Sequence, residues 1–285
     1  MKDCKTSWKV EPVLVDDSMF NAEDFGVFVF PSLIVGIGHV ASGKSTLMYN
    51  LIEKFNPVFE GHVIVFSPTF ENDPIGHKIK EDDMILEHFS DFSNAILQRV
   101  LEVIRDDPDE TQKYLIIFDD ILGLLPKMVM SHEAKFWNNF ISTYRHGGGI
   151  AHEGQVSLLF FTQYYKDLSP VLRANSSFVM FLGSHSEKHK KQYSEELNAV
   201  CEGSDEKFME LYNHCKAGKY DIMMLDFRNL NVYKNLDELV YSRDAQYANK
   251  EDDKVDDKEI DDNKDDKHGT SATRGKDDKK DDIKK

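Results

Sequence analysis

The segment from Gly38 to Ser45 constrains this chain most strongly, and it reads Gly-His-Val-Ala-Ser-Gly-Lys-Ser. It fits the pattern G-x-x-x-x-G-K-[ST] in full, with a short apolar run before it at Ser32–Ile37 and a helix-like segment after it at Ser45–Lys54. A strand, a glycine-rich turn and a helix in this order let backbone N–H groups and the positive end of the helix dipole converge on phosphate oxygens. An ordinary glycine-rich turn before a helix is the alternative, and the context of the match disfavours it. The segment therefore predicts a phosphate-binding loop.

The side chains of this loop predict a nucleotide bound together with a magnesium ion. Lys44 can place its charge on the β- and γ-phosphates, and the Ser45 hydroxyl is a ligand for Mg²⁺. Thr46 can assist through its backbone or at the α-phosphate. ATP and Mg²⁺ are the expected cofactors, and the predicted cofactor-binding residues are Gly38, His39, Val40, Ala41, Ser42, Gly43, Lys44, Ser45 and Thr46.

Strand-like and helix-like segments alternate along the chain. The strand candidates are short, continuous apolar runs, as expected for strands buried on both faces, and they lie at 32–37, 62–66, 114–118, 156–161 and 178–182. Further strand-like pieces lie at 10–15, 27–30 and 220–225, and helix candidates at 44–55, 91–105, 132–144 and 187–202. This alternation predicts an α/β fold with a mostly parallel central sheet and helices on both faces.

Two carboxylates end one of these apolar strands. Asp119 and Asp120 follow Tyr114–Phe118 directly, and unpaired carboxylates beside a core are costly unless they have a task. In nucleotide hydrolases with this loop, the first acid holds Mg²⁺ through water, which we predict for Asp119. The second is then placed to polarise the attacking water as a general base, which we predict for Asp120. A pair of N-caps for a helix over Ile121–Leu125 is the alternative.

A third buried strand, Val156–Phe161, ends in Thr162 and Gln163. The Gln163 amide can hydrogen-bond both the attacking water and the γ-phosphate, although it could also serve as a simple cap of the strand end. We expect Val156–Phe161 to lie between the strand of the phosphate loop and the strand that bears the acids. That order is typical of the additional-strand (RecA/FtsK-like) class of P-loop ATPases.

Two arginines are candidates for the cation that reaches the γ-phosphate of a neighbouring subunit. Arg145 precedes His146-Gly-Gly-Gly149, and the three glycines predict a mobile loop. Arg173 lies just past the Gln163 strand. A surface salt bridge is the alternative for each arginine.

The net charge of the chain and one local basic run bear differently on whether it binds nucleic acid. The formal net charge is −16, which disfavours a surface coated with positive charge for nucleic acid. The compact basic run Lys188-His-Lys-Lys191 could contact DNA phosphates, or it could be a solvated helix face. The sequence has no apolar run of about 18 residues, so we expect no membrane span. Its first residues lack the apolar core of a signal peptide.

The end of the chain has a different composition. Residues 250–285 hold 14 Asp and Glu, 11 Lys and Arg, and no aromatic residue. Such a segment cannot bury enough apolar surface to offset its ordering entropy. We therefore predict an N-terminal strand extension over residues 1–30, a P-loop ATPase domain over residues 31–243 and a disordered, charged tail over residues 244–285.

Taken in order, these motifs resemble those of the FtsK–HerA superfamily. The resemblance is greatest to the genome-packaging ATPases of large DNA viruses, virophages and Maverick/Polinton elements, including the poxvirus type. It spans about residues 32–182 and rests on the segments 38–46, 63–69, 115–120, 144–146, 161–163 and 172–175. The Arg145-His pair before the Gln163 strand and the Arg173-x-Asn pattern after it narrow the choice most.

The resemblance implies a motor that forms a ring of identical subunits and pumps double-stranded DNA into a capsid. Its partners would be DNA, further copies of itself and, as a further candidate, a capsid protein. Its expected location is the virion or the viral factory in the host cytoplasm. The resemblance also makes Arg145 the first choice for the arginine that acts in trans, with Arg173 second.

Two other functions fit the phosphate loop. A kinase of nucleotides or small molecules would need a lid rich in arginines, but residues 121–155 contain only Arg145. An assembly module that binds ATP without hydrolysing it is kept open by Asp120, because many ATPases of this type carry Glu at that place.

Overall fold

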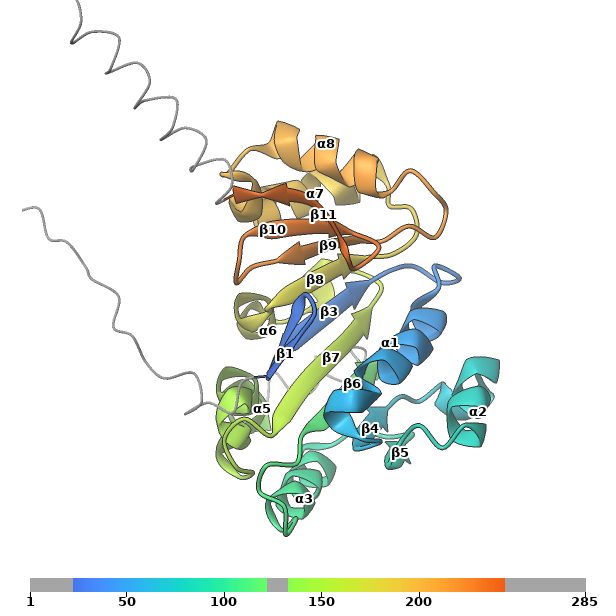
Figure 1. Ribbon diagram of the computed structural model, residues 1–285, viewed down its shortest axis with the longest axis vertical. Helices are drawn as coiled ribbons and strands as arrows, with labels where there is room; N and C mark the ends of the chain where they lie inside the picture. Colours follow the sequence, from blue (N-terminus) through green and yellow to red (C-terminus); the bar gives the residue numbers. More distant parts are fainter. Residues whose placement is uncertain (1–22, 122–132, 244–285) are drawn as a thin grey trace, which may run out of the picture. The chain divides into compact units, whose positions relative to one another are not determined.

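The computed structural model describes residues 23–121 and 133–243, and the structural statements below concern these residues alone. The strand candidate at 10–15, the alternative helix after Ile121 and the charged tail over 244–285 lie outside them. A central sheet of nine strands dominates the described residues (Figure 1).

The sheet has the strand order β11-β10-β9-β8-β3-β7-β6-β4-β5. The six strands from β8 to β5 pair in parallel, whereas β9, β10 and β11 pair antiparallel. The strands are β3 Leu33–Ile37, β4 Val63–Phe66, β5 Glu87–Phe89, β6 Tyr114–Asp119, β7 Val156–Thr162, β8 Phe178–Phe181, β9 Met223–Asp226, β10 Asn231–Lys234 and β11 Glu238–Ser242. The prediction of a mostly parallel α/β sheet is confirmed.

Strand β7 lies between β3, which leads into the phosphate loop, and β6, which ends in Asp119. Ile37 at the end of β3 pairs with Thr162, and Phe161 pairs with Asp119. The predicted additional strand is therefore present. Because all three strands run in parallel, the phosphate loop, Gln163 and the acidic pair come to one edge of the sheet.

The helices cover both faces of this sheet (Figure 1). They are α1 Lys44–Phe59, α2 Pro74–Glu81, α3 Asn94–Arg105, α5 Glu133–Thr143, α6 Pro170–Asn175, α7 Glu187–Leu197 and α8 Asp205–Cys215. Helices α2, α3, α6, α7 and α8 each begin after an Asp or Ser whose side chain accepts a backbone N–H, which stabilises the first turn.

Alternation along the strands sorts the core into two layers. Leu33, Val35 and Ile37 point to the face covered by α3, α5, α6, α7 and α8. Ile34 points to the opposite face, which α1 and α2 cover. A two-stranded hairpin of β1 Glu23–Phe25 and β2 Phe28–Phe30 packs onto α1 on that face.

Several short elements escaped prediction from sequence. Helices α2, α6 and α8 and strands β5, β10 and β11 are 3 to 11 residues long, and their patterns are too short to separate from loops. The segment predicted as a helix over 187–202 is α7 followed by a short 3₁₀ turn, Asn198–Cys201. The additional strands extend the sheet, β5 beyond β4 and β10 and β11 beyond β9, and they leave β7 between β3 and β6 as predicted.

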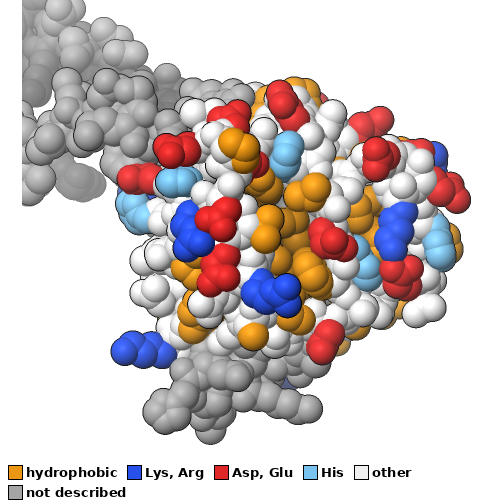
Figure 2. Space-filling view, turned by 90° about the horizontal axis from the view of Figure 1, so that it is seen from below, with side chains coloured by type: hydrophobic (Ala, Val, Ile, Leu, Met, Phe, Trp, Pro, Cys, Tyr) orange, Lys and Arg blue, Asp and Glu red, His pale blue; other side chains and the backbone are white. Residues whose placement is uncertain are grey.

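One exposed face carries an apolar groove. The groove lies between β5 and α3, has a volume of about 440 Å³ and includes Leu86, which is 53% exposed, and Val103, which is 64% exposed. Figure 2, seen from below the view of Figure 1, shows apolar side chains gathered between charged ones.

Candidate nucleotide-binding site

The phosphate loop joins β3 to α1 in a conformation that depends on its glycines. Gly43 has φ of 95°, in the left-handed region that favours glycine, and it precedes the first residue of α1. A Cβ atom on Gly38 would lie 2.3 Å from the Ser42 Oγ. No side chain caps α1, so its first N–H groups stay free to bind an anion.

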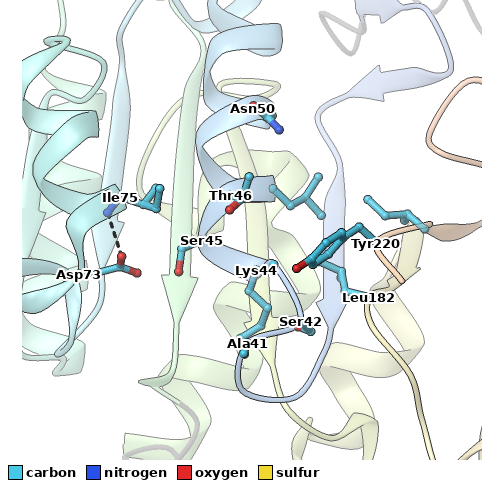
Figure 3. A pocket seen from close by; sticks show the side chains of 13 residues that line it. Ala41, Ser42, Lys44, Ser45, Thr46, Asn50, Asp73, Ile75, Leu182 and Tyr220 are labelled. Atoms are coloured by element: carbon cyan, nitrogen blue, oxygen red, sulfur yellow. Dashed lines mark hydrogen bonds between the residues drawn. The ribbon is translucent and has the colours of Figure 1, made fainter. Parts of the chain in front are cut away.

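A cavity of about 570 Å³ opens over this loop and the first turns of α1. Lys44 lies at its floor and donates from Nζ to the backbone oxygens of Gly38, at 2.9 Å, and His39, at 3.2 Å. These carbonyl groups hold the ammonium over the loop. Figure 3 shows Ser45 and Asp73 on one side of α1 and Tyr220 and Leu182 on the other.

Not every predicted loop residue turns its side chain to this cavity. Val40 is 79% exposed at the tip of the loop. The His39 ring packs instead against Tyr164, with ring centroids 5.3 Å apart, and against His185 and His189, at 5.2 and 5.7 Å. Burial, His189 and Lys44 lower the pKa of His39. The loop is thereby packed against the start of α7, and the part of the loop that lines the cavity begins at Ala41.

Asp119 is the buried carboxylate of the site, with 8% of the residue exposed. Its Oδ2 accepts a hydrogen bond from the Ser67 Oγ at 3.2 Å. Burial and the charge of Asp120 raise the pKa of Asp119 to about 6, whereas Ser67 and Lys44 lower it. The charge of Asp73 also raises this pKa, so a third carboxylate acts on Asp119.

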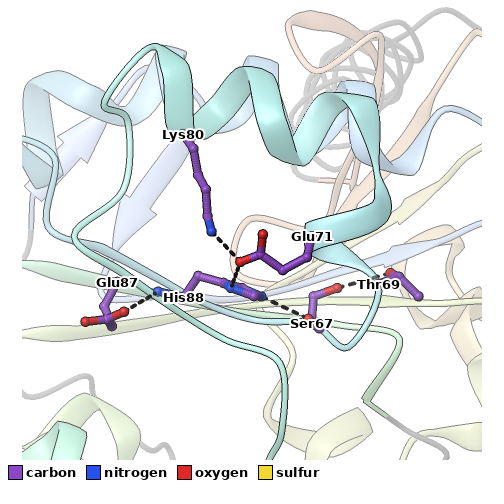
Figure 4. Close-up of polar contacts among 6 residues, drawn as sticks. All are labelled: Ser67, Thr69, Glu71, Lys80, Glu87 and His88. Atoms are coloured by element: carbon purple, nitrogen blue, oxygen red, sulfur yellow. Dashed lines mark hydrogen bonds and ion pairs between the residues drawn. The ribbon is translucent and has the colours of Figure 1, made fainter.

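Ser67 is itself held by a polar network that continues away from the site (Figure 4). The Ser67 Oγ lies 3.2 Å from the hydroxyl of Thr69, and the Nε2 of His88 donates to the Ser67 backbone oxygen at 3.0 Å. Glu71 in turn pairs with His88 and with Lys80 of α2. Ser67, just after β4, thus positions the Asp119 carboxylate, and His88 of β5 holds the Ser67 backbone in turn.

Asp120 and Gln163 lie beside Asp119 at the same edge of the sheet. Asp120 is exposed and has φ of 52°, so the chain turns sharply where β6 ends. Asp119 belongs to β6 itself, which disfavours a helix-cap role for it. Gln163 is half-buried and follows Thr162, whose backbone oxygen accepts from Gly38 N–H at 2.9 Å.

Arg145 lies at the opposite edge of the sheet from the phosphate loop. Its Nη2 donates to the Ser177 Oγ at 3.1 Å and its Nε to the Tyr144 hydroxyl at 3.0 Å. Ser177 is bonded through its backbone to Leu33, at the start of β3. At about 3.3 Å per residue, five residues of strand separate Leu33 from Gly38 by about 16 Å. Arg145 therefore lies at the end of β3 remote from the phosphate loop of its own chain.

The glycines after Arg145 form a packed turn in place of the mobile loop expected from sequence. Gly147 and Gly148 are buried and have φ of 67° and 65°. A Cβ atom on Gly147 would lie 2.7 Å from a backbone oxygen, and one on Gly148 would lie 2.6 Å from the ring of Phe140. These glycines thereby fix the position from which Arg145 projects.

Arg173, on α6, is engaged within its own chain. Its guanidinium pairs with Glu196 of α7 and lies over the Tyr165 ring, 5.5 Å from the centroid. The salt bridge that sequence left as an alternative is present for this arginine.

The structure adds site residues that sequence reasoning missed. They are Ser67, which positions Asp119, and the cavity residues Asn50, Asp73, Leu182, Tyr220 and Ile222. The Asp73-Pro74 pair is a helix-start signal and would have placed Asp73 at the beginning of α2. Tyr220 and Ile222 reach the loop only through the strand order, which no local pattern encodes.

The donor set of the site fits the magnesium ion that the motif implies. Mg²⁺ prefers hard oxygen ligands, with several waters retained. The Ser45 hydroxyl and the Asp119 and Asp73 carboxylates are such groups, and each lies at or beside the cavity.

Solved structures share the fold of this chain. The chain is similar to the genome packaging NTPase B204 from Sulfolobus turreted icosahedral virus 2, seen in complex with AMPPCP (TM-score 0.50, 13% identity, covering 72% of this chain and 96% of that one). Its complex with sulfate gives a TM-score of 0.51 at 13% identity, covering 71% and 95%. The fold is that of a P-loop NTPase. No protein-family model and no curated protein sequence matches the chain.

This P-loop NTPase fold is of the additional-strand class, as the position of β7 requires. Among its described helices, none combines the length and the apolar character that crossing a membrane would need.

Proposed function

We propose that the chain is an ATP-hydrolysing, double-stranded DNA translocase of the FtsK–HerA superfamily that packages a viral or virus-like genome into a capsid. The observation that carries the proposal is the meeting of the phosphate loop, Gln163 and the acidic pair at one edge of the sheet, with Arg145 at the other. The fold shared with a genome packaging NTPase supports it.

In this proposal, each group at the sheet edge has its own task in hydrolysis. Lys44 and the N–H groups of α1 bind the phosphates, and Ser45 and Asp119 would hold Mg²⁺, which supplies positive charge to the transferring phosphoryl group. Asp120 accepts a proton from the attacking water. Gln163 orients that water and contacts the γ-phosphate.

The proposed ring of identical subunits gives Arg145 a role. Arg145 contacts Ser177, beside the start of β3, about 16 Å of strand away from the phosphate loop, and in a ring it would serve the site of a neighbouring subunit. Arg173 is the second candidate, but its pairing with Glu196 would first have to break. We therefore assign Arg145 the role in trans.

The proposed DNA contact is the basic run on α7. Lys188 and Lys191 are exposed, whereas Lys190 pairs with Glu187 at 2.7 Å. His189 of α7 packs against His39 of the phosphate loop, so a movement of the loop would displace this part of α7. A capsid protein is a further proposed partner, and the virion or viral factory the proposed location.

The test is ATP hydrolysis by the wild type, with and without double-stranded DNA, beside the variants Lys44→Ala and Lys54→Ala. Lys54 is an exposed lysine of the same helix and serves as the matched control. We expect DNA-stimulated hydrolysis that Lys44→Ala abolishes and Lys54→Ala leaves unchanged.

The other outcomes point to other functions. Absence of hydrolysis under every condition contradicts the proposal. Tight ATP binding without phosphate release, unchanged in Asp120→Asn, would instead identify a non-hydrolysing assembly module.

A further inference from the structure

The cavity over the phosphate loop is bounded on one side by apolar side chains. Besides the loop and α1, it is lined by Leu182, which follows β8, and by Tyr220 and Ile222, which precede β9. The Tyr220 ring comes within 3.9 Å of where a Cβ atom on Gly43 would lie. An aromatic ring therefore adjoins the point at which the phosphate chain would enter the first turn of α1.

Tyr220 is 65% exposed, which is unusual for so large an apolar side chain. The loop that presents it is nevertheless braced. Asp221 accepts a hydrogen bond from Gly218 N–H at 2.8 Å and lies 3.7 Å from the Lys234 ammonium. Ile222 and Asn235 exchange two hydrogen bonds of 2.9 Å. The Lys219 ammonium lies over the Tyr220 ring, 4.9 Å from its centroid. An exposed ring on a braced loop beside a phosphate site is suited to stack on a flat ligand through a face that this lysine leaves open.

The same side of α1 also presents a polar group. Asn50 lies four residues after Thr46, so the two share one face of the helix, and both line the cavity. Figure 3 shows Asn50 and Tyr220 on the same side of α1. An asparagine amide offers one donor group and one acceptor, which matches the N7 and N6 edge of adenine. Guanine presents two acceptors at the corresponding edge and matches this amide less well.

We propose that Tyr220, with Leu182 and Ile222, forms the base-binding part of the site and that Asn50 selects adenine there. This inference rests on the proposed function, since it concerns the same nucleotide. It assigns the phosphates to one part of the cavity and the base to another, so that the two parts can be tested separately.

The first experiment compares two probes by isothermal titration: AMPPCP, which has a base, and inorganic tripolyphosphate, which has none. Stacking of a base on an aromatic ring changes affinity by roughly 5- to 160-fold when the ring is removed. We expect Tyr220→Ala to weaken AMPPCP binding by this factor and to leave tripolyphosphate binding unchanged. Tyr220→Phe should retain wild-type affinity, as should Leu239→Ala, which removes an exposed apolar side chain elsewhere.

The outcomes separate this inference from the function on which it rests. Equal weakening of both probes, or weakening of neither, in Tyr220→Ala overturns the base site while the phosphate site stands. Failure of both probes to bind the wild type overturns the proposed function, and the base site with it.

A second comparison tests Asn50. We expect the wild type to bind AMPPCP more tightly than GMPPCP and Asn50→Ala to lose this preference while binding tripolyphosphate normally. A preference for adenine that persists in Asn50→Ala would overturn the role of this residue.

Discussion

Asp119 is placed where it costs the protein stability, and this cost can be measured. Its carboxylate is almost fully buried beside a second acid, and its pKa is raised from 3.8 to about 6. A raised pKa means that the folded state binds the proton more tightly than the unfolded state. Ionisation of Asp119 therefore lowers the free energy of unfolding. The loss is absent at a pH below 3.8, where Asp119 is protonated in both states, and it grows as the pH rises from 3.8 to about 6.

The substitution Asp119→Asn should remove this cost. A difference of about two pKa units, at about 1.36 kcal/mol each, gives about 3 kcal/mol at pH 8 and roughly half of that at pH 5. Asn has nearly the same shape and can keep the hydrogen bond from Ser67. We therefore expect the nucleotide-free variant to be more stable than the wild type, by an amount that grows with pH.

The assay is urea unfolding at pH 5 and pH 8 with EDTA present, so that no divalent ion binds. Asp120→Asn is the matched control, because Asp120 is exposed and its own charge is solvated. The control should change the unfolding free energy by less than Asp119→Asn does. A variant Asp119→Asn that is no more stable than the wild type at pH 8 would refute the reasoning.

Three further predictions follow from packing and charge. Gly183→Ala places a Cβ atom 2.8 Å from that of Ser42 and should weaken AMPPCP binding at least tenfold by titration, whereas Gly61→Ala, with a similar φ and open space around it, should not. Lys44→Ala and Arg145→Ala should each abolish ATP hydrolysis alone, and mixing the two variants should restore part of it, because the two residues then serve different subunits. Reversing the charge of Lys188 and Lys191 to Glu should remove the stimulation of hydrolysis by DNA and leave the basal rate unchanged, and an unchanged stimulation would contradict the proposed DNA contact.

The local sequence was sufficient to predict the phosphate loop and the strand that ends in Asp119. The loop needs glycine at left-handed positions such as Gly43, and a strand buried on both faces must be continuously apolar, as Tyr114–Phe118 is. These requirements act over a few residues, so that a short motif contains them. The position of β7 was also predicted, although through the order of motifs and not through any local property.

Other parts of the site depend on contacts between distant segments. Ser67 reaches Asp119 across 52 residues, and Tyr220, which precedes β9, reaches Gly43 because only β8 lies between β9 and β3. Neither residue has a pattern of its own, because its role follows from which strands are neighbours. The same holds for the raised pKa of Asp119, which arises from burial and from charges brought near by folding.

The phosphate loop was determined by the sequence itself, since its geometry is a matter of local backbone freedom and helix polarity. The tertiary structure alone decided what surrounds that loop. It packed the His39 ring against α7, engaged Arg173 with Glu196 and set Arg145 at the far edge of the sheet. The physical reason is that the neighbours of a residue depend on where its strand lies in the sheet, and the sequence near Gly38 does not specify that position.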